Sequence, residues 1–418
     1  MHEFKYKNNE LYCESVRVSQ VATKVGTPFY LYSYATFLDH FHKLQNAFQS
    51  VKPIICFSVK SNSNLAVLKS LVKAGAGLDI VSGGELYRAL KVGADPQKIV
   101  FAGVGKTEDE IEFAIKKKIL FFNVESLPEL EAIQRVAKRI KQKARVSLRV
   151  NPDVKANTHA HITTGTSQNK FGIDFSHALW IFKRAHLFTN VKLVGLHVHI
   201  GSQITEAKPF LMALHRVFSL IDNLNRHGAD IRYLNMGGGL GVIYKDEKPQ
   251  TAQQFAKQIL PQLKKRSLQY VFEPGRFIAG NSGIFVTKVL YNKVAPAKHF
   301  VIVDGAMNDL LRPSLYDAYH GVLPVKKRSR KKIVADIVGP ICESGDYFAK
   351  NRALQTMHEG ELLAIMTAGA YGFTMSSNYN TRPRVAEVMV KGSQFEIIRK
   401  RESWDDCLRG ERIPAFLK

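Results

Sequence analysis

The sequence lacks several features that are typical of membrane, exported and metal-binding proteins. None of its 418 residues lie in a run of about 18 uncharged apolar residues, so we expect no membrane-spanning helix. The first five residues, MHEFK, show no apolar export signal. Cysteine is scarce, and Cys13, Cys56, Cys342 and Cys407 form no C-x-x-C pair and have no histidine at metal-ligand spacing. We therefore expect no metal site and a cytoplasmic protein with reduced thiols.

Acidic residues are also few. The chain has 36 of them against 60 lysines and arginines, which gives a formal net charge of +24. Such an excess can indicate a nucleic-acid-binding surface or simply a solvated basic one. The densest run, residues 326–332, falls between two strand-like segments, where a loop is expected, and no nucleic-acid motif accompanies it. We therefore favour a solvated surface and expect no nucleic-acid partner.

The pattern that is present from about residue 50 onward is an alternation of short β-rich runs with helical stretches of 3.6-residue periodicity. Several runs are almost entirely apolar, as expected for strands buried on both faces. Eight such runs fit a closed (β/α)8 barrel, with an open doubly wound sheet as the alternative. The eight predicted strands are Ile54–Val59, Gly77–Val81, Lys98–Ala102, Ile119–Val124, Ala144–Val150, Val191–Ile200, Ile231–Met236 and Gln269–Phe272.

The pattern changes after about residue 281, where strands follow one another without long helices between them. This predicts a mainly antiparallel β domain, to which short alternating segments before about Leu31 could add strands. We therefore expect a barrel domain over residues 32–280 and a β domain over residues 1–31 and 281–418. The predicted C-terminal strands are Ile284–Val294, His299–Val303, Ile333–Val338, Glu361–Thr367, Arg384–Val390 and Gln394–Lys400.

Working residues of a (β/α)8 barrel gather at the C-terminal ends of its strands, and two of these ends carry unusual side chains. The first strand ends at Lys60, which is either a snorkelling surface lysine or a Schiff-base lysine in a partly desolvated site. The sixth ends in His197-Val198-His199-Ile200-Gly201-Ser202. The two histidines point the same way, but nothing nearby suggests a third metal ligand. His199 is suited to stack on a flat ring, and Ser202 could contact a phosphate.

The last two strand ends suggest an anion site beside a carboxylate. The seventh strand is followed by Gly237, Gly238 and Gly239, whose missing Cβ atoms allow backbone amides to converge on an anion. The loops after strands seven and eight are the usual phosphate site of such barrels, which favours the barrel over the open sheet. The eighth strand ends at Glu273, which could hydrogen-bond a protonated pyridine nitrogen. Together these groups describe a site for pyridoxal 5'-phosphate (PLP).

The sequence resembles the PLP-dependent decarboxylases of the alanine racemase fold (fold type III), and among them the family that acts on diaminopimelate. The resemblance runs through almost the whole chain. In the barrel it is carried by residues 56–64, 77–85, 170–172, 199–203 and 273–276. In the C-terminal domain it is carried by residues 307–309, 311–316, 339–346 and 369–372. Ser58 and Ser61 stand where the family often has alanine, a small departure.

The resemblance implies a role for each matching residue. Lys60 and Cys342 would be catalytic, with Lys60 joined to PLP and Cys342 supplying a proton. Arg312, Tyr316 and Glu343 would bind substrate, and Arg276 and Tyr371 would contact both substrate and cofactor. The remaining residues implied to bind the cofactor are Asp79, His199, Ser202, Gly237, Gly238, Gly239, Glu273, Pro274 and Gly275.

The reaction implied is the decarboxylation of meso-2,6-diaminopimelate to L-lysine and carbon dioxide, the last step of lysine biosynthesis, by a carboxy-lyase. The family also implies a homodimer with shared active sites, in which Cys342 and Glu343 come from the partner subunit. A decarboxylase for another basic amino acid would not need Arg312 for a distal carboxylate. A racemase would pair the pyridine nitrogen with arginine, where this chain has Glu273.

Overall fold

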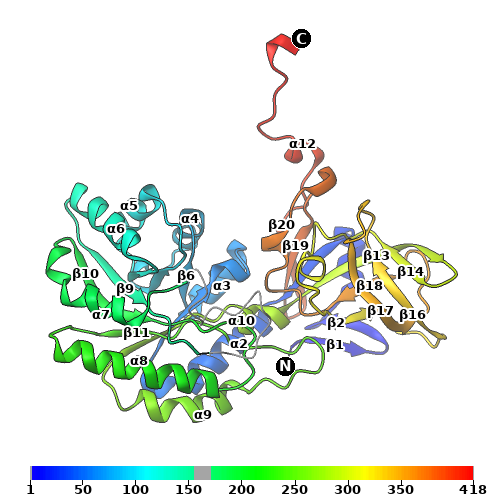
Figure 1. Cartoon of the computed structure of the whole chain (residues 1–418). Coiled ribbons are helices and arrows are strands. Elements are labelled where there is room, and N and C mark those ends of the chain that lie inside the picture. Colours follow the sequence, from blue (N-terminus) through cyan, green and yellow to red (C-terminus); the bar gives the residue numbers. More distant parts are fainter. Residues whose placement is uncertain (1, 155–170, 418) are drawn as a thin grey trace. The chain divides into compact units, whose positions relative to one another are not determined.

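The computed structural model describes residues 2–154 and 171–417, so Lys170 of the resemblance lies outside the described residues. The chain forms two compact units. One is continuous, Phe37–Ile278. The other combines both ends of the chain, Met1–Thr36 and Ala279–Lys418. Figure 1 shows the helices and strands of each unit.

Eight parallel strands of the continuous unit close into a barrel, as the sequence predicted. Each strand pairs with the next along the chain, and the last, β12, pairs with the first, β5. Closure rules out the open doubly wound sheet. The strands are β5 (Ile54–Ser58), β6 (Gly77–Ile80), β7 (Ile99–Phe101), β8 (Phe121–Val124), β9 (Ala144–Arg149), β10 (Val191–His197), β11 (Tyr233–Asn235) and β12 (Gln269–Phe272).

Helices follow the barrel strands and bury one apolar face each. Six of them begin after a side chain that accepts a hydrogen bond from the first helical turn, which satisfies an otherwise unpaired amide. These caps are Asn64, Ser82, Thr107, Ser126, Asp174 and Thr251. The helices are α2 (Tyr34–Ala47), α3 (Leu65–Lys73), α4 (Gly83–Lys91), α5 (Glu108–Lys116), α6 (Leu127–Arg139), α7 (Phe175–Lys183), α8 (Lys208–Arg226), α9 (Ala252–Leu263) and the short α10 (Arg276–Ala279).

The unit made from both chain ends is a β structure. Near the N-terminus, β1 (Phe4–Lys7), β2 (Glu10–Cys13) and β3 (Val16–Arg17) form a small antiparallel sheet, followed by helix α1 (Val18–Val25). The larger sheet has nine strands. They are β4 (Phe29–Ser33), β13 (Gly283–Val294), β14 (His299–Val303), β15 (Val322–Pro324), β16 (Lys332–Val338), β17 (Tyr347–Gln355), β18 (Leu362–Ile365), β19 (Ala386–Lys391) and β20 (Gln394–Arg399), with helices α11 (Arg312–Tyr316) and α12 (Trp404–Cys407).

This larger sheet is mainly antiparallel, as predicted, but two pairs are parallel: β14 with β16 and β19 with β4. Strands β15 and β17 were not predicted from the sequence. Strand β17 carries the polar run Lys350-Asn351-Arg352, and Asn351 has a left-handed backbone with φ of 49°. The register against β16 shifts in this region, so the alternation that identifies a half-buried strand is broken.

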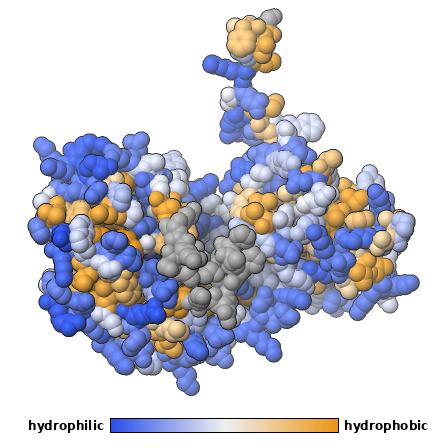
Figure 2. Space-filling view, in the orientation of Figure 1, coloured by the Kyte–Doolittle hydropathy of each residue, from blue (hydrophilic) through white to orange (hydrophobic). Residues whose placement is uncertain are grey.

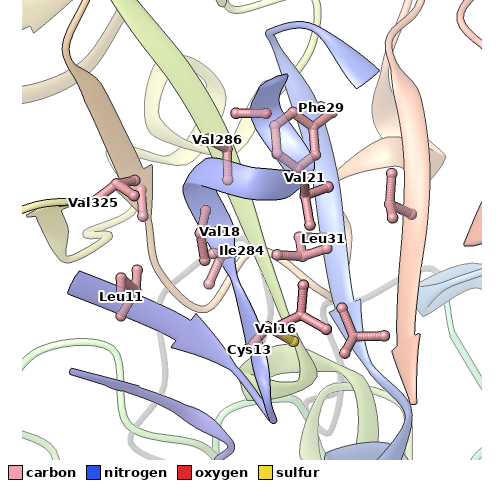
Figure 3. Close-up of a cluster of buried hydrophobic side chains, with 14 of the residues drawn as sticks. Leu11, Cys13, Val16, Val18, Val21, Phe29, Leu31, Ile284, Val286 and Val325 are labelled. Carbon is pink, nitrogen blue, oxygen red and sulfur yellow. The ribbon is translucent and has the colours of Figure 1, made fainter. Parts of the chain in front are cut away.

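The core of the β unit draws on segments distant in sequence. Figure 3 shows Leu11, Val16 and Val21 from the N-terminal segments packed with Ile284 and Val286 of β13. All are buried, and each buried aliphatic side chain contributes about 1.5–3 kcal/mol relative to leaving it exposed. Hydrophilic residues, blue in Figure 2, cover much of the visible surface of each unit. None of the described helices is long and apolar enough to cross a membrane.

Candidate active site

Lys60 lies directly after β5 and forms an ion pair with Asp79 of β6. Its side chain is 39% exposed, whereas Asp79 is fully buried. The hydroxyl of Ser58 donates to the same Asp79 oxygen, Oδ2, over 2.7 Å. The other oxygen, Oδ1, is buried with no hydrogen-bond partner among the described residues. Burial, followed by the charge of Glu273, raises the pKa of Asp79 while Lys60 lowers it.

Glu273 lies after β12 and is 6% exposed. Its Oε1 accepts hydrogen bonds from Asn123 Nδ2 at 2.9 Å and Asn235 Nδ2 at 2.5 Å. Its Oε2 lies 3.3 Å from Nε2 of His197. Burial alone would raise the pKa of Glu273, but His197, Lys60 and Asn235 together lower it, so the group is a carboxylate.

His199 is half-buried beside the glycine loop, residues 237–239. The amide of Gly238 donates to its Nδ1 over 3.2 Å. Burial, followed by the charge of Arg149, lowers the pKa of His199 to about 3. The ring is therefore neutral at physiological pH and can cover a cationic aromatic ring without charge repulsion.

The glycine loop has the shape expected of an anion-binding turn. Gly237 and Gly239 have φ of 64° and 115°, and a Cβ on Gly238 would collide with the carbonyl oxygen of Glu273. The amide of Gly237 donates to Asn235 Oδ1 over 2.9 Å, and that of Gly238 donates to His199. These two amides are thus used within the protein, where they fix the loop beside Glu273.

Arg276, at the start of α10, provides a cation at the same end of the barrel. Its Nε donates to Ser202 Oγ over 3.2 Å, and its Nη1 donates to the Tyr244 hydroxyl over 2.6 Å. Gly275 lies just before it, and a Cβ there would come within 3.1 Å of Ser58 Cβ. In the same turn, the carbonyl oxygen of Pro274 accepts a hydrogen bond from the amide of Ser58 over 3.1 Å. The turn after β12 is therefore packed closely against the turn after β5.

These groups fit PLP. A primary amine and a buried carboxylate lie at one end of the barrel, together with a glycine loop, a hydroxyl and a guanidinium suited to a phosphate. Buried polar atoms without partners among the described residues, Asp79 Oδ1 and Arg149 Nη2, are typical of a site that receives a polar ligand. When bound, PLP acts as an electron sink for the bond that breaks.

The predicted substrate residues other than Arg276 lie in the β unit. Arg312 begins α11 and is buried, with Nη1 2.9 Å from Nε2 of His320. Tyr316 ends the same helix and is partly exposed. The β16–β17 loop, residues 339–346, carries Cys342 and Glu343, which are both exposed. Ser314 of α11 donates to the Gly345 carbonyl over 2.5 Å, so helix and loop are neighbours.

Several further features of the β unit concern the predicted site residues. Asp346 accepts the amides of Met307 and Ile341, each over 2.7 Å, which holds the loop in place. Glu343 accepts the Tyr379 hydroxyl over 2.8 Å. Tyr371 has φ of 56°, a left-handed conformation that is costly for a tyrosine and common at functional sites. Cys342 is a free thiol.

Sequence reasoning overlooked several residues of the barrel site. Asn123 and Asn235 are fully buried amides in apolar strands, a pattern that signals a specific polar partner. His197 had been considered only in a metal pair; it faces Glu273, and no cluster of metal-binding side chains occurs among the residues described. Arg149 is buried and pairs with Glu125 over 2.7 Å, and Tyr244 contacts Arg276. Neither residue belongs to a sequence motif that would have identified it.

Comparison with known proteins gives a consistent result. Residues 34–280 match the family model for the pyridoxal binding domain of pyridoxal-dependent decarboxylases. The diaminopimelate decarboxylase of Vibrio cholerae is 48% identical over 96% of this chain and 97% of its own. That of Pseudomonas aeruginosa is 48% identical over 99% of each chain.

Solved structures agree. The crystal structure of diaminopimelate decarboxylase from Helicobacter pylori, complexed with L-lysine, matches with a TM-score of 0.90 and 41% identity, over 94% of this chain and 98% of that one. The enzyme from M. jannaschii, in complex with L-lysine, matches with a TM-score of 0.95 and 35% identity over the whole of both chains.

Proposed function

This chain belongs to the diaminopimelate decarboxylases, a family of pyridoxal-dependent enzymes, and from that premise we propose that it converts meso-2,6-diaminopimelate to L-lysine and carbon dioxide. The activity is that of a carboxy-lyase in lysine biosynthesis, and the cofactor is PLP. The observation that carries the proposal is the grouping of Lys60, Asp79, His199 and Glu273 beside the glycine loop at one end of the barrel.

The barrel residues would hold and orient the cofactor. Lys60 supplies the amine that binds its aldehyde carbon, and His199 covers one face of its ring. Ser202, Gly239, Gly275 and Arg276 supply the phosphate contacts, while Gly237 and Gly238 keep the loop open beside them. Glu273 accepts a hydrogen bond from the ring nitrogen and so keeps a proton on that atom. Pro274 fixes the turn between Glu273 and Gly275.

The β-unit residues would recognise the substrate. Arg312 is a buried guanidinium on α11, and a guanidinium can bind a carboxylate through two parallel N–H donors, which suits Arg312 to the distal carboxylate of diaminopimelate. Tyr316, Glu343 and Tyr371 would complete the contacts, with Glu343 on the distal ammonium.

As part of the same proposal, the working unit is a homodimer in which Cys342 and Glu343 serve the site of the partner subunit. An exposed thiol beside an exposed carboxylate, on a loop fixed by Asp346, is an arrangement suited to action outside its own fold. Cys342 would donate a proton to the carbon that loses its carboxylate. We also propose a cytoplasmic location, because all four cysteines are free thiols, the usual state in a reducing compartment.

The reaction is tested by incubating the PLP-loaded protein with meso-diaminopimelate and measuring lysine and carbon dioxide. We expect both products in equal amounts, with little turnover of ornithine or arginine, which lack a distal carboxylate. Preferential release of carbon dioxide from ornithine or arginine would overturn the substrate assignment.

The essential control is Lys60→Ala. Without the amine, the protein should show no turnover and no visible absorption band that borohydride abolishes. Turnover at the wild-type rate in Lys60→Ala would overturn the role of Lys60.

A further inference from the structure

The carboxylate of Glu273 is held from three directions by side chains of three other strands. Asn123 of β8 and Asn235 of β11 each donate a hydrogen bond to this carboxylate, and His197 of β10 contacts it. Asn123 and Asn235 are fully buried, and His197 is 1% exposed. None of the three belongs to the residues that the resemblance assigns to the cofactor or the substrate.

The donors leave one acceptor position for a ligand. A carboxylate offers about four lone-pair positions, two on each oxygen. The two amides occupy both positions on Oε1, and His197 lies against one position on Oε2. The remaining position on Oε2 is the one that can accept a further N–H.

The orientation of each donor is fixed by its surroundings. The oxygen of Asn235 accepts the amide of Gly237 over 2.9 Å, so its Nδ2 must face Glu273. That same Nδ2 lies 3.5 Å from Asn123 Oδ1, which leaves Asn123 Nδ2 directed at Glu273. An imidazole carries N–H on Nε2 both in one neutral tautomer and when protonated, so His197 can donate in either form. Neither ring nitrogen of His197 has a hydrogen-bond partner of regular geometry among the described residues, and Nε2 lies in contact with Glu273 Oε2 at 3.3 Å.

We propose that His197, Asn123 and Asn235 are positioning residues that hold Glu273 as a carboxylate with one acceptor position directed at the ring nitrogen of PLP. The inference rests on the proposed function, since it needs PLP in this site. Donors to the charged form of a buried acid favour that form over the neutral one. A neutral Glu273 could not hold a proton on the ring nitrogen, and the ring would then be a weaker electron sink.

A merely structural network would also satisfy buried polar atoms, so the test must read the state of the ring nitrogen itself. The 15N chemical shift of PLP labelled at that nitrogen distinguishes its protonated from its unprotonated form. It is measured on the loaded protein without substrate and therefore does not depend on turnover.

A matched pair of substitutions at His197 isolates the donor. The amide nitrogen of glutamine reaches about as far as Nε2 of histidine, whereas that of asparagine reaches only as far as Nδ1. His197→Gln should keep the ring nitrogen protonated, and kcat should fall little. His197→Asn should shift the 15N signal toward the unprotonated form and lower kcat by about 10-fold or more, because a hydrogen bond to a charged group is lost.

A second variant acts on the opposite side of the carboxylate. Asn123→Asp has nearly the same shape but replaces a donor to Glu273 by a second acid, which should drive a proton onto the pair and off the ring nitrogen. A cooperative thermal unfolding transition of each PLP-free variant shows that the variant is folded. If either His197→Asn or Asn123→Asp is not folded, the 15N signal of the other variant tests the proposal.

The outcomes separate this inference from the proposed function. A wild-type protein that binds no PLP would overturn both. A wild-type protein that binds PLP and decarboxylates diaminopimelate, with the 15N signal of His197→Asn and Asn123→Asp unchanged, would overturn the positioning role alone. A shift in His197→Asn that His197→Gln does not show would support it.

Discussion

Individual residues of the barrel site combine charge with deep burial, and Glu273 is the clearest case. Its carboxylate is 6% exposed, and burial alone would raise its pKa. Such a group persists as an anion only where hydrogen bonds and nearby positive charge offset the cost of desolvation. Substitutions here should therefore change chemistry more than stability.

Glu273→Gln should fold and bind PLP but react slowly. The amide retains the size of the side chain but cannot hold the ring nitrogen protonated, so we expect kcat to fall on the order of 10²-fold or more. Steady-state kinetics on the PLP-saturated variant measure this. Glu112→Gln on α5, where Glu112 pairs with Lys116, serves as control and should leave kcat within about twofold of wild type. A kcat within about twofold of wild type for Glu273→Gln would contradict the assignment of Glu273 to the ring nitrogen.

Arg312 offers a second prediction at this scale. Arg312→Ala should raise KM for diaminopimelate by roughly 10²-fold, because a charged hydrogen bond is worth about 1.5–3 kcal/mol and the substrate carboxylate is left unpaired. The control is Arg328→Ala, which removes an exposed arginine of the same unit that pairs with Glu361. If both variants show the wild-type KM, other groups bind the distal end.

At the level of the secondary-structure elements, the glycine loop after β11 has little steric tolerance. Gly238→Ala would push a methyl group into the backbone of Glu273, and overpacking of this kind costs about 1–3 kcal/mol. We expect PLP affinity to fall by about 10-fold, measured by titrating the PLP-free protein. At Gly105 a Cβ meets nothing within 4 Å, so Gly105→Ala should bind PLP normally. Equal PLP affinities for Gly238→Ala and Gly105→Ala would contradict the steric restriction at Gly238.

The elements also show how far the sequence alone could lead. All eight barrel strands were predictable because short β-rich runs recur between periodic helices, and the strands that form are three to seven residues long. The predicted strand Val191–Ile200 ends earlier, at His197, because the following residues form the turn that carries His199. Strand β17 was missed because its polar residues and irregular register hide the alternation.

The site was predictable where a motif ends a strand, as at Lys60 and Glu273. It was not predictable where a residue matters only through its neighbour. Asn123 and Asn235 come from strands that are distant in sequence, and only closure of the barrel directs both amides at one carboxylate. No local pattern encodes that convergence.

For the whole molecule, the proposed homodimer makes a quantitative prediction. If Cys342 serves the partner's site, Lys60→Ala and Cys342→Ala should each be nearly inactive alone. After subunit exchange, half of the dimers are mixed, and each mixed dimer has one of its two sites intact, so activity should approach about a quarter of wild type.

The mixing experiment needs evidence of exchange, for instance from differently tagged subunits recovered together. Mixed dimers without activity would show that Cys342 acts within its own chain or that the dimer model is wrong. A protein that is monomeric and fully active would contradict the shared site directly.

The two-part origin of the β unit also bears on synthesis by the ribosome. Strand β4 is buried throughout and pairs with β13 on one side and β19 on the other, so its first neighbour is complete only at residue 294 and its second only at residue 391. The barrel segment, Phe37–Ile278, is complete before then. The nascent chain must therefore carry an apolar strand with two unpaired edges while the barrel assembles, and such edges invite association with other chains. Release of a chain that ends before β19 would leave one of those edges permanently open.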